Sequence, residues 1–400
     1  GNAMKNSTLP EIKLKQGCSR RIKAGSPWVF SNEIDMTADA KQIPAGSIVK
    51  LTDNTGTFLG LGTFNAHSLI AFRKIASDVQ TEINTAFIAK KLRRCVALRD
   101  ALVNSPFYRL VHSEGDGLPG LIIDRFDDIV ACQINTAGMD LMKESVVAAI
   151  DEVLHPSCIV LRAESAARSL EGLEPLYEVA KGTLPDVVPV RENGIYFYAD
   201  LKEGQKTGWF YDQRENRAFV GRLAPNKRCI DFYTYAGGFA LHMGIGHAKE
   251  IIGVDRSEQA LDLAKKAAET NGLTDKASWI RDNAFDVLEN MNKDKEKFGI
   301  VVCDPPAFAK VKKDIQAGLR GYRKMARLAA GLVERDGILA LGSCSHHVKP
   351  DEFLAECSRG ITEAGKSGRL ILQAGAGPDH PVHPHLPETA YLKCLVYQLD

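Results

Sequence analysis

The chain has 400 residues with 51 Lys and Arg against 50 Asp and Glu, so net charge alone identifies no partner. The hydrophobic fraction of 44% is ample for packed cores, and the length indicates two or three domains. The nine cysteines form no C-x-x-C pair, which excludes a cysteine zinc site of that type and argues against a disulfide framework. No apolar run approaches the roughly 18 residues that span a bilayer, so we expect a cytoplasmic protein.

The first segment, residues 4–77, consists of short β-rich runs separated by glycines, which predicts a small β-barrel-like domain. Ten Lys and Arg stand against five Asp and Glu in residues 1–77, a local excess of positive charge. The basic run Arg20, Arg21 and Lys23 is a candidate RNA contact, although such a run is more often an ordinary solvated face.

The second segment, residues 78–190, mixes helical and strand patterns. Apolar spacing predicts a helix over residues 82–102, and another is expected near 140–153. Residues 108–125 have the pattern of a strand, a tight glycine turn and a second strand, which is a hairpin signal. We expect a small α+β middle domain.

The third segment, residues 191–400, contains five apolar runs that each end in a polar residue. Runs without polar alternation suit strands buried on both faces of a parallel sheet, whose carboxyl ends share one edge where ligands bind. The sequence therefore predicts a doubly wound α/β domain. The polar residues at that edge are Asp231, Asp255, Asp282, Asp304 and Cys344.

The edge suits an adenosine-bearing ligand. The loop after the first strand lacks G-x-G-x-x-G, so the pyrophosphate fingerprint of a dinucleotide site is missing and a nicotinamide oxidoreductase is disfavoured. Asp255 is placed to accept hydrogen bonds from a ribose diol, and Asp282 to meet an adenine. We expect S-adenosylmethionine, and the candidate cofactor-binding residues are Asp231, Tyr233, Gly237, Gly238, Asp255, Arg256, Asp282, Asn283 and Ala284, with Gln213 and Arg214 on a helix capped by Asp212.

The turn that begins at Asp304 is followed by two prolines and by Phe308, whose ring could stack a flipped base. The next residues, up to Arg327, contain seven Lys and Arg but only one acid. Basic residues mixed with aromatics favour a nucleic-acid backbone as partner, although an amphipathic surface helix has the same pattern. The candidate RNA contacts here are Phe308, Lys310, Arg320, Tyr322 and Arg323.

Cys344 is a candidate nucleophile, although a cysteine at the end of a buried strand is more often inert. Carbon 5 of a pyrimidine becomes nucleophilic when a thiolate adds to carbon 6, and an acid near N3, here Asp304, would assist. Nearby positive charge would be needed to favour the thiolate.

Taken together, these motifs resemble the S-adenosylmethionine-dependent 23S rRNA cytosine-5 methyltransferases of the RlmI type. The resemblance spans nearly the whole chain and includes residues 27–31, the hairpin motif 114–120, residues 204–208 and 212–214, and the Asp231, Asp304 and Cys344 motifs.

The resemblance implies an N-terminal PUA RNA-binding domain, a small α+β middle domain and a C-terminal class I methyltransferase domain with a Rossmann-like, seven-stranded sheet. It also implies that Cys344 is the nucleophile, Asp304 the active-site acid, and rRNA the partner. Many other RNA cytosine-5 methyltransferases carry a second cysteine three residues after the motif Asp. Ala307 stands there, and Cys303 is expected to face the core.

Other interpretations remain open. The Asp304 turn also suits methylation of an exocyclic amine without a cysteine, and the chain could be an RNA-binding assembly factor without turnover. Three histidines in residues 380–385 could indicate a metal, but no carboxylate or cysteine cluster accompanies them, so we expect none. A homodimer is possible, and the modified nucleotide is not identified by the sequence.

Overall fold

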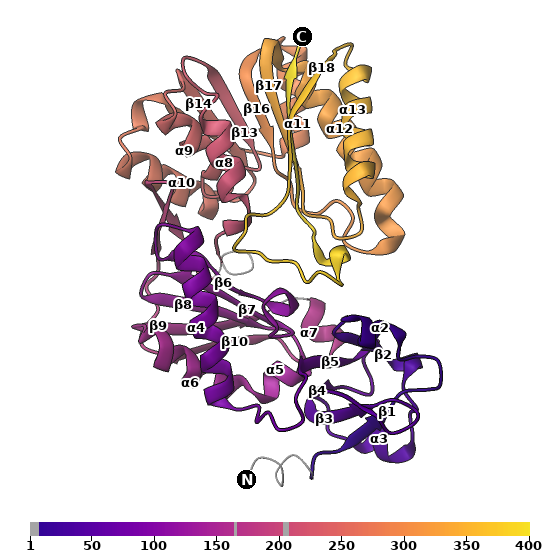
Figure 1. Cartoon of the computed structure of the whole chain (residues 1–400). Helices are drawn as coiled ribbons and strands as arrows, with labels where there is room; N and C mark the ends of the chain where they lie inside the picture. The colour runs from indigo at the N-terminus through magenta and orange to yellow at the C-terminus, as the bar shows by residue number, and fades with distance from the viewer. Residues whose placement is uncertain (1–7, 164–165, 203–207) are drawn as a thin grey trace. The chain divides into compact units, whose positions relative to one another are not determined.

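The computed structural model describes residues 8–163, 166–202 and 208–400, so residues 4–7 of the first predicted domain and 204–207 of the glycine motif lie outside it. The chain divides into two compact units, shown in Figure 1. Unit 1 comprises Gly1–Asp186, Leu201–Trp209 and Pro378–Pro387, and unit 2 comprises Val187–Asp200, Phe210–Gly377 and Glu388–Asp400. No helix in the described ranges is both long enough and apolar enough to cross a membrane.

Unit 1 begins with a five-stranded sheet in the order β1-β3-β4-β5-β2. The β1–β3 pair is parallel and the other pairs are antiparallel. Its core contains the fully buried side chains of Val49, Leu51 and Phe72. The elements are β1 (Glu11–Lys13), α2 (Arg20–Ala24), β2 (Trp28–Phe30), α3 (Ala38–Gln42), β3 (Ser47–Thr52), β4 (Phe58–Phe64) and β5 (Ile70–Ala76), which confirms the predicted β-rich N-terminal domain.

A second five-stranded sheet of unit 1 has the order β10-β9-β8-β7-β6. The predicted hairpin is present as the antiparallel pair β6–β7, and α4 carries the predicted helical pattern. The elements are α4 (Thr85–Leu102), β6 (Phe107–His112), β7 (Leu121–Phe126), β8 (Ile129–Ile134), α5 (Ala137–Leu141), α6 (Lys143–Leu154), β9 (Cys158–Ala163), α7 (Ala166–Leu170) and β10 (Leu176–Lys181).

A buried ion network fixes the distant segment Pro378–Pro387 within unit 1. Arg99 on α4 donates two hydrogen bonds of 2.7 Å to Asp116 and one of 3.0 Å to the Asp379 carbonyl. The Asp379 carboxylate accepts the backbone N–H of Arg109 at 3.0 Å and lies 3.1 Å from Nδ1 of His380. These charges are buried, so each depends on its partner for stabilisation.

Unit 2 contains a seven-stranded sheet in the order β15-β14-β13-β16-β17-β19-β18, which confirms the predicted class I architecture. The first five strands pair in parallel, and β19 is antiparallel to both β17 and β18. The strands are β13 (Arg228–Phe232), β14 (Glu250–Asp255), β15 (Ala277–Arg281), β16 (Phe298–Cys303), β17 (Val333–Ser343), β18 (Gly368–Ala374) and β19 (Lys393–Leu399), with a separate hairpin of β11 (Val188–Glu192) and β12 (Ile195–Ala199).

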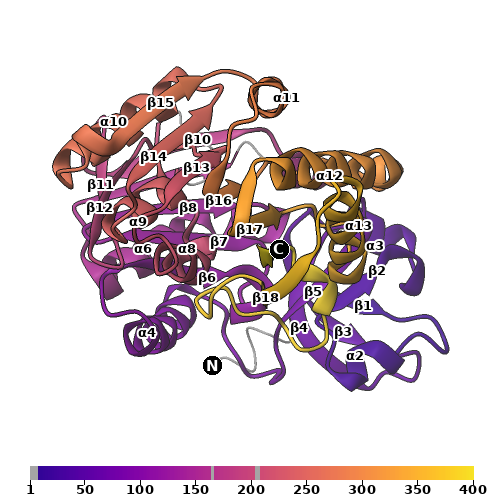
Figure 2. The same cartoon turned by 90° about the horizontal axis from the view of Figure 1, so that it is seen from above.

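The helices of unit 2 alternate with the parallel strands. Figures 1 and 2 show α12 and α13 side by side at one flank of the sheet. Ser257 caps α10 by accepting the N–H of Ala260, as predicted, and Cys303 is fully buried in the core, also as predicted. The helices are α8 (Arg214–Gly221), α9 (Gly238–Ile245), α10 (Glu258–Thr270), α11 (Ala284–Lys293), α12 (Ile315–Gly331) and α13 (Pro350–Glu363).

The predicted helix cap at Asp212 is wrong. A 3-10 turn, Tyr211–Gln213, precedes α8, and Gln213 occupies the cap position without a side-chain cap bond. The Asp212 carboxylate instead accepts a 2.7 Å hydrogen bond from the Tyr391 hydroxyl. Asp212 therefore accepts a hydrogen bond from a residue distant in the sequence instead of capping the start of α8.

Substituting Arg99 tests the buried network of unit 1. Arg99→Met leaves the Asp116 carboxylate, whose side chain is only 7% exposed, without its cation, so we expect a loss of about 3–5 kcal/mol in unfolding free energy. Arg93 on the same helix is a matched control, because its pair with Glu152 is exposed and Arg93→Met should cost below about 1 kcal/mol. Urea unfolding followed by circular dichroism measures both, and equal losses would contradict the assignment.

Candidate active site

The five polar residues predicted at the ligand edge lie at or just after the carboxyl ends of five neighbouring strands. Because β15, β14, β13, β16 and β17 are parallel and adjacent, their carboxyl ends form one row. Hydrogen bonds link parts of this row: the Asp282 N–H donates to the Asp255 carbonyl, and the Asp304 N–H to the Phe232 carbonyl. In spatial order the row is Asp282, Asp255, Asp231, Asp304 and Cys344.

Asp231 organises the loop after β13. Its Oδ2 accepts hydrogen bonds from the Thr234 hydroxyl at 2.7 Å and from the Ala240 N–H at 3.0 Å. Burial raises the pKa of Asp231 to about 7, against the lowering effect of those two bonds. Within the described chain its buried Oδ1 accepts no hydrogen bond, which is costly without a ligand donor.

The same loop has an unusual backbone. Tyr233, Tyr235 and Gly237 have φ values of 62°, 53° and 89°, and such angles in two non-glycine residues are a strained arrangement typical of functional loops. The Tyr235 N–H donates to Asp255 Oδ2 at 2.9 Å, so the predicted ribose acceptor also holds the loop. Gly238 begins α9, and a Cβ there would lie 3.0 Å from the Arg217 side chain.

The remaining predicted cofactor residues lie on the loops after β14 and β15. Asp255 is half-buried, while Arg256 and Asp282 are exposed. Asn283 accepts the N–H groups of Phe285 and Asp286 and so caps α11, which leads into buried Ala284. The structure thus brings these candidates to the sheet edge, with Asn283 serving a structural bond as well.

Asp304 lies at the centre of a hydrogen-bonded chain. Gln213 donates to Asp304 Oδ1 at 3.1 Å, and Asn216 donates to Gln213 Oε1 at 2.8 Å, which orients the amide. Burial raises the pKa of Asp304 to about 7, the charge of Asp212 raises it further, and Arg217 and Gln213 oppose the rise. A carboxyl group of this kind is poised to donate a proton near neutral pH.

A buried ion pair supports this region from beneath. Arg217 donates to the two carboxylate oxygens of Glu192 at 2.7 and 2.9 Å, and both side chains are buried. Burial opposes the charge of Glu192, but Arg217 prevails and lowers the pKa of the carboxyl group. Predicted Arg214, at the start of the same helix, is also buried.

Cys344 lies just beyond the end of β17 and is half-buried. Its Sγ is 3.9 Å from the carbonyl oxygen of Pro305 in the Asp304 turn, so the two candidate catalytic segments adjoin. Of the other cysteines, only Cys18 is not fully buried. Cys344 therefore has the exposure that a nucleophile requires.

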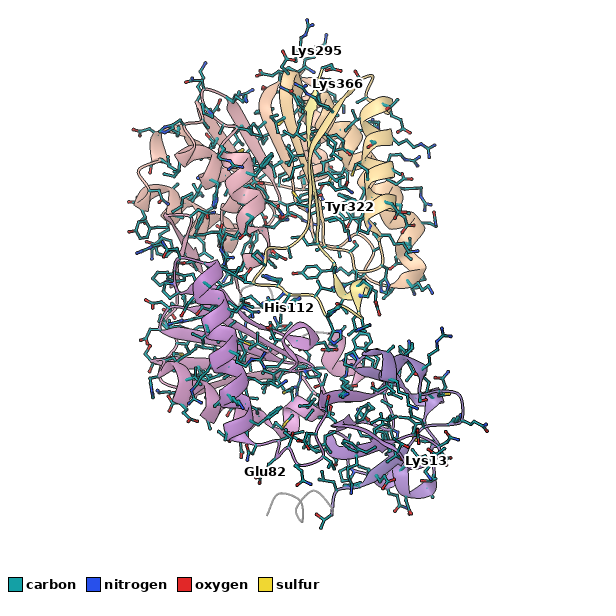
Figure 3. The ribbon with its side chains drawn as sticks, in the orientation of Figure 1. Lys13, Glu82, His112, Lys295, Tyr322 and Lys366 are labelled. Atoms are coloured by element: carbon teal, nitrogen blue, oxygen red, sulfur yellow. The ribbon has the colours of Figure 1, made fainter. Side chains whose placement is uncertain are left out.

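The prediction that Tyr322 contacts RNA is wrong. Its side chain, labelled in Figure 3, is fully buried. Its hydroxyl lies 2.5 Å from Ser345 Oγ, accepts from Ser343 Oγ at 2.9 Å and accepts the Phe308 N–H at 3.3 Å. Tyr322 therefore ties the Asp304 turn to the residues on either side of Cys344.

The other predicted RNA contacts differ in availability. Lys310, Arg320 and Arg20 are exposed. Arg323 instead lies 3.6 Å from Glu356 and 3.9 Å from Glu363, which reduces its net positive field. Phe308 is half-buried and stacks on Tyr322 at 4.6 Å, while Arg21 and Lys23 pair with Glu33 and Asp53.

The sequence reasoning did not identify Tyr391 and Lys393. Tyr391 bonds to Asp212, as described, and its ring stacks on His346 at 5.1 Å. Lys393 is buried and donates to the carbonyls of Ser345 and Tyr391. One signal was available: Lys393 directly precedes the apolar residues Cys394–Val396 in β19, where a lysine is out of place unless it has partners.

The chemistry of the residues at this sheet edge fits S-adenosylmethionine. Asp231 Oδ1 and Asp212 Oδ1 are both buried without a hydrogen-bond donor among the described residues. A ligand that carries an ammonium and a sulfonium group would supply the missing positive charge, and the Asp255 carboxylate can accept from a diol. Over the described ranges, no group of three His, Cys, Asp or Glu residues could hold a metal.

Comparison with known proteins identifies the families to which parts of this sequence belong. The sequence matches the PUA-like domain family over residues 12–76 and the S-adenosylmethionine-dependent methyltransferase family over residues 162–398. Proteins named ribosomal RNA large subunit methyltransferase I, from Shigella dysenteriae serotype 1 and Escherichia coli O157:H7, are each 33% identical over 388 residues, covering 96% of this chain and 97% of theirs.

Solved structures agree on the fold. A chain from Streptococcus mutans, assigned as a SAM-dependent methyltransferase, superposes with a TM-score of 0.81 at 19% identity, covering 98% of this chain and 100% of its own. Another methyltransferase structure, solved with SAH, gives 0.83 at 19% identity with the same coverage.

The raised pKa values of Asp231 and Asp304 predict a pH-dependent stability. Because each folded pKa, about 7, exceeds the usual 3.8, the folded state holds these protons more tightly, and stability falls as pH rises from about 4 to about 7. Asp231→Asn and Asp304→Asn each remove one of these titrating carboxyl groups. Without bound ligand, the unfolding free energy of each variant should therefore fall less steeply with rising pH than that of wild type. Unfolding free energies at pH 5, 6, 7 and 8 measure this, and slopes equal to wild type would exclude the raised values.

Proposed function

Because this chain belongs to the S-adenosylmethionine-dependent methyltransferase family, we propose that it methylates carbon 5 of a cytidine in large-subunit ribosomal RNA through a covalent Cys344 adduct. The name shared by its full-length relatives supports ribosomal RNA as the substrate. The observation that carries the choice of atom is the adjacency of Cys344 to the Asp304 turn, with Sγ 3.9 Å from the Pro305 carbonyl.

The reaction begins with addition of the Cys344 thiolate to carbon 6 of the cytosine. The new Sγ–C6 bond draws the ring electrons toward N3, which takes a proton from Asp304, and carbon 5 gains enamine character. Asp304 can supply that proton because its pKa of about 7 leaves a substantial neutral fraction near neutral pH. S-adenosylmethionine, when bound, supplies the methyl group that carbon 5 takes up.

Product release requires loss of the carbon 5 proton and cleavage of the Sγ–C6 bond. Ala307 stands where many related enzymes have a second cysteine, so that route is closed to this chain. We assign the proton to water, after which the electron pair of the C5–H bond restores the C5–C6 double bond and Cys344 leaves as the thiolate. Asp304, now ionised, recovers its proton from N3.

We also propose three domains, 4–77, 78–190 and 191–400, of which the first acts as an RNA-contacting PUA module. Arg20 on α2 and Lys310 and Arg320 near the Asp304 turn are exposed cations suited to phosphate contact. Phe308 would stack the flipped cytosine, which is typically worth about 1–3 kcal/mol per base.

The specific alternative is methylation of the exocyclic N4 amine. The Asp304 carboxylate and the Pro305 carbonyl could accept amino hydrogens there, and no cysteine would be needed. That reaction and the proposed one differ in their dependence on Cys344.

Replacing Cys344 distinguishes the two. With labelled S-adenosylmethionine and unmodified ribosomal RNA, wild type should yield 5-methylcytidine, and Cys344→Ala at least about 100-fold less while still binding cofactor. Cys18→Ala, at the other cysteine that is not fully buried, should match wild type. Nucleoside analysis reports the modified atom, and an active Cys344→Ala or label on the exocyclic nitrogen would replace the C5 proposal with the amine alternative.

A trapping experiment tests the adduct itself. Substrate RNA with 5-fluorocytidine at the target should form a stable complex with wild type, because fluorine cannot leave carbon 5 as a cation. The complex should be absent with Cys344→Ala and present with Cys18→Ala.

Phosphate contact by Lys310 and Arg320 predicts weaker, less salt-dependent RNA binding after substitution. Lys310→Ala and Arg320→Ala should each lower affinity and reduce the slope of log K against log salt by about 1. Lys324→Ala is the control, since Lys324 is on the same helix as Arg320 but lies 3.2 Å from Glu289. Filter binding from 50 to 200 mM salt measures the slopes; if Lys324→Ala shifts the slope as much as the others, this contact assignment fails.

A further inference from the structure

Lys393 is a buried cation beside the end of β17. It opens β19, and the antiparallel register pairs it with Ser343, the residue before Cys344. Its side chain is buried, with the residue only 4% exposed, which is rare for lysine and requires specific partners. The sheet therefore fixes this ammonium group next to the candidate nucleophile.

The ammonium group is held in place by main-chain acceptors. Nζ donates to the Ser345 carbonyl at 2.6 Å and to the Tyr391 carbonyl at 2.7 Å. These carbonyls are neutral and contribute no negative charge to balance the lysine. Two of its three N–H donors are thus used, and the charge remains available to act on Cys344.

Burial and two negatively charged groups act on the Lys393 ammonium. Burial lowers the pKa of Lys393 to about 8, whereas the Cys344 thiolate and Glu352 raise it. Glu352 comes from the first turn of α13, and Tyr322 on α12 also interacts with Cys344. The Cys344 thiolate and the Lys393 ammonium therefore stabilise each other's charge.

We propose that Lys393 is a positioning residue that stabilises the Cys344 thiolate. The thiol S–H bond breaks, its electron pair stays on sulfur, and the proton passes to neutral Lys393 or, where Lys393 is already charged, to water. This extends the proposed function, because it supplies the positive charge that carbon 6 addition requires. The pairing of Ser343 with Lys393 on adjacent strands, with Cys344 as the next residue after Ser343, carries the inference.

The test measures the nucleophile directly, without RNA. Iodoacetamide alkylation of Cys344, followed by mass spectrometry of its peptide from pH 5.5 to 10, reports the thiolate fraction. In Lys393→Met and Lys393→Gln we expect the midpoint to rise by at least about one pH unit and the rate at pH 7 to fall about tenfold. The Gln variant keeps an N–H donor for the two carbonyls but removes the positive charge. It therefore distinguishes an effect of the lost charge from an effect of the lost hydrogen bonds and packing.

Lys366→Met is the matched control. Lys366, labelled in Figure 3, also donates to a carbonyl of β17, but to Val333 at the opposite end of that strand. Its substitution should leave the Cys344 midpoint unchanged. Circular dichroism and cofactor binding verify that each variant is folded.

The outcomes separate this inference from the proposed function. If the folded Met and Gln variants show the wild-type midpoint of Cys344 alkylation, the proposed role of Lys393 is wrong. That conclusion does not depend on which methylated nucleoside the wild-type protein produces. A shifted midpoint upholds it, even if wild type proves to methylate the exocyclic amine and the C5 proposal fails. If both hold, the pH profile of 5-methylcytidine formation should move to higher pH in Lys393→Gln.

Discussion

Parallel pairing of five strands is the constraint on which the site depends. Parallel strands place every carboxyl end at one edge, so Asp231 and Asp304, which are 73 positions apart in sequence (304 − 231), become neighbours there. The proposed cofactor acceptors, the proposed acid and the proposed nucleophile each lie at the end of a different strand of this row. Their spacing is set by the distance between strands rather than by loop conformation, which limits the entropy lost on ordering the site.

Buried polar contacts orient the side chains that lie at the ends of the strands. Gln213 reaches Asp304 and is itself held by Asn216, while the Tyr322 hydroxyl connects the Asp304 turn to both neighbours of Cys344. Glu192 and Arg217 form a paired charge beneath the same region. Breaking one such contact is costly, because the buried groups cannot form a hydrogen bond to water instead. The site is therefore rigid.

The parts visible in the sequence were those with a local signature. Apolar runs that end in Asp predicted the ends of the strands, and Ser257 predicted the start of a helix. Tyr322 was misassigned because basic neighbours suggested a surface, although its spacing with Leu319 and Ala326 places it on the buried face of α12. The Asp212–Tyr391 bond joins residues 179 positions apart and has no local signature. The partnership of Lys393 likewise depends on a strand register that local patterns do not contain.

The position of β19 has a consequence for the synthesis of the protein. This strand follows every other strand of the sheet in sequence, yet it lies between β17 and β18. A nascent chain that lacks it exposes two unpaired strand edges, which are sites for aggregation or chaperone binding. It also lacks Lys393, the first residue of β19. The chain therefore cannot complete this sheet while β19 is still inside the ribosome.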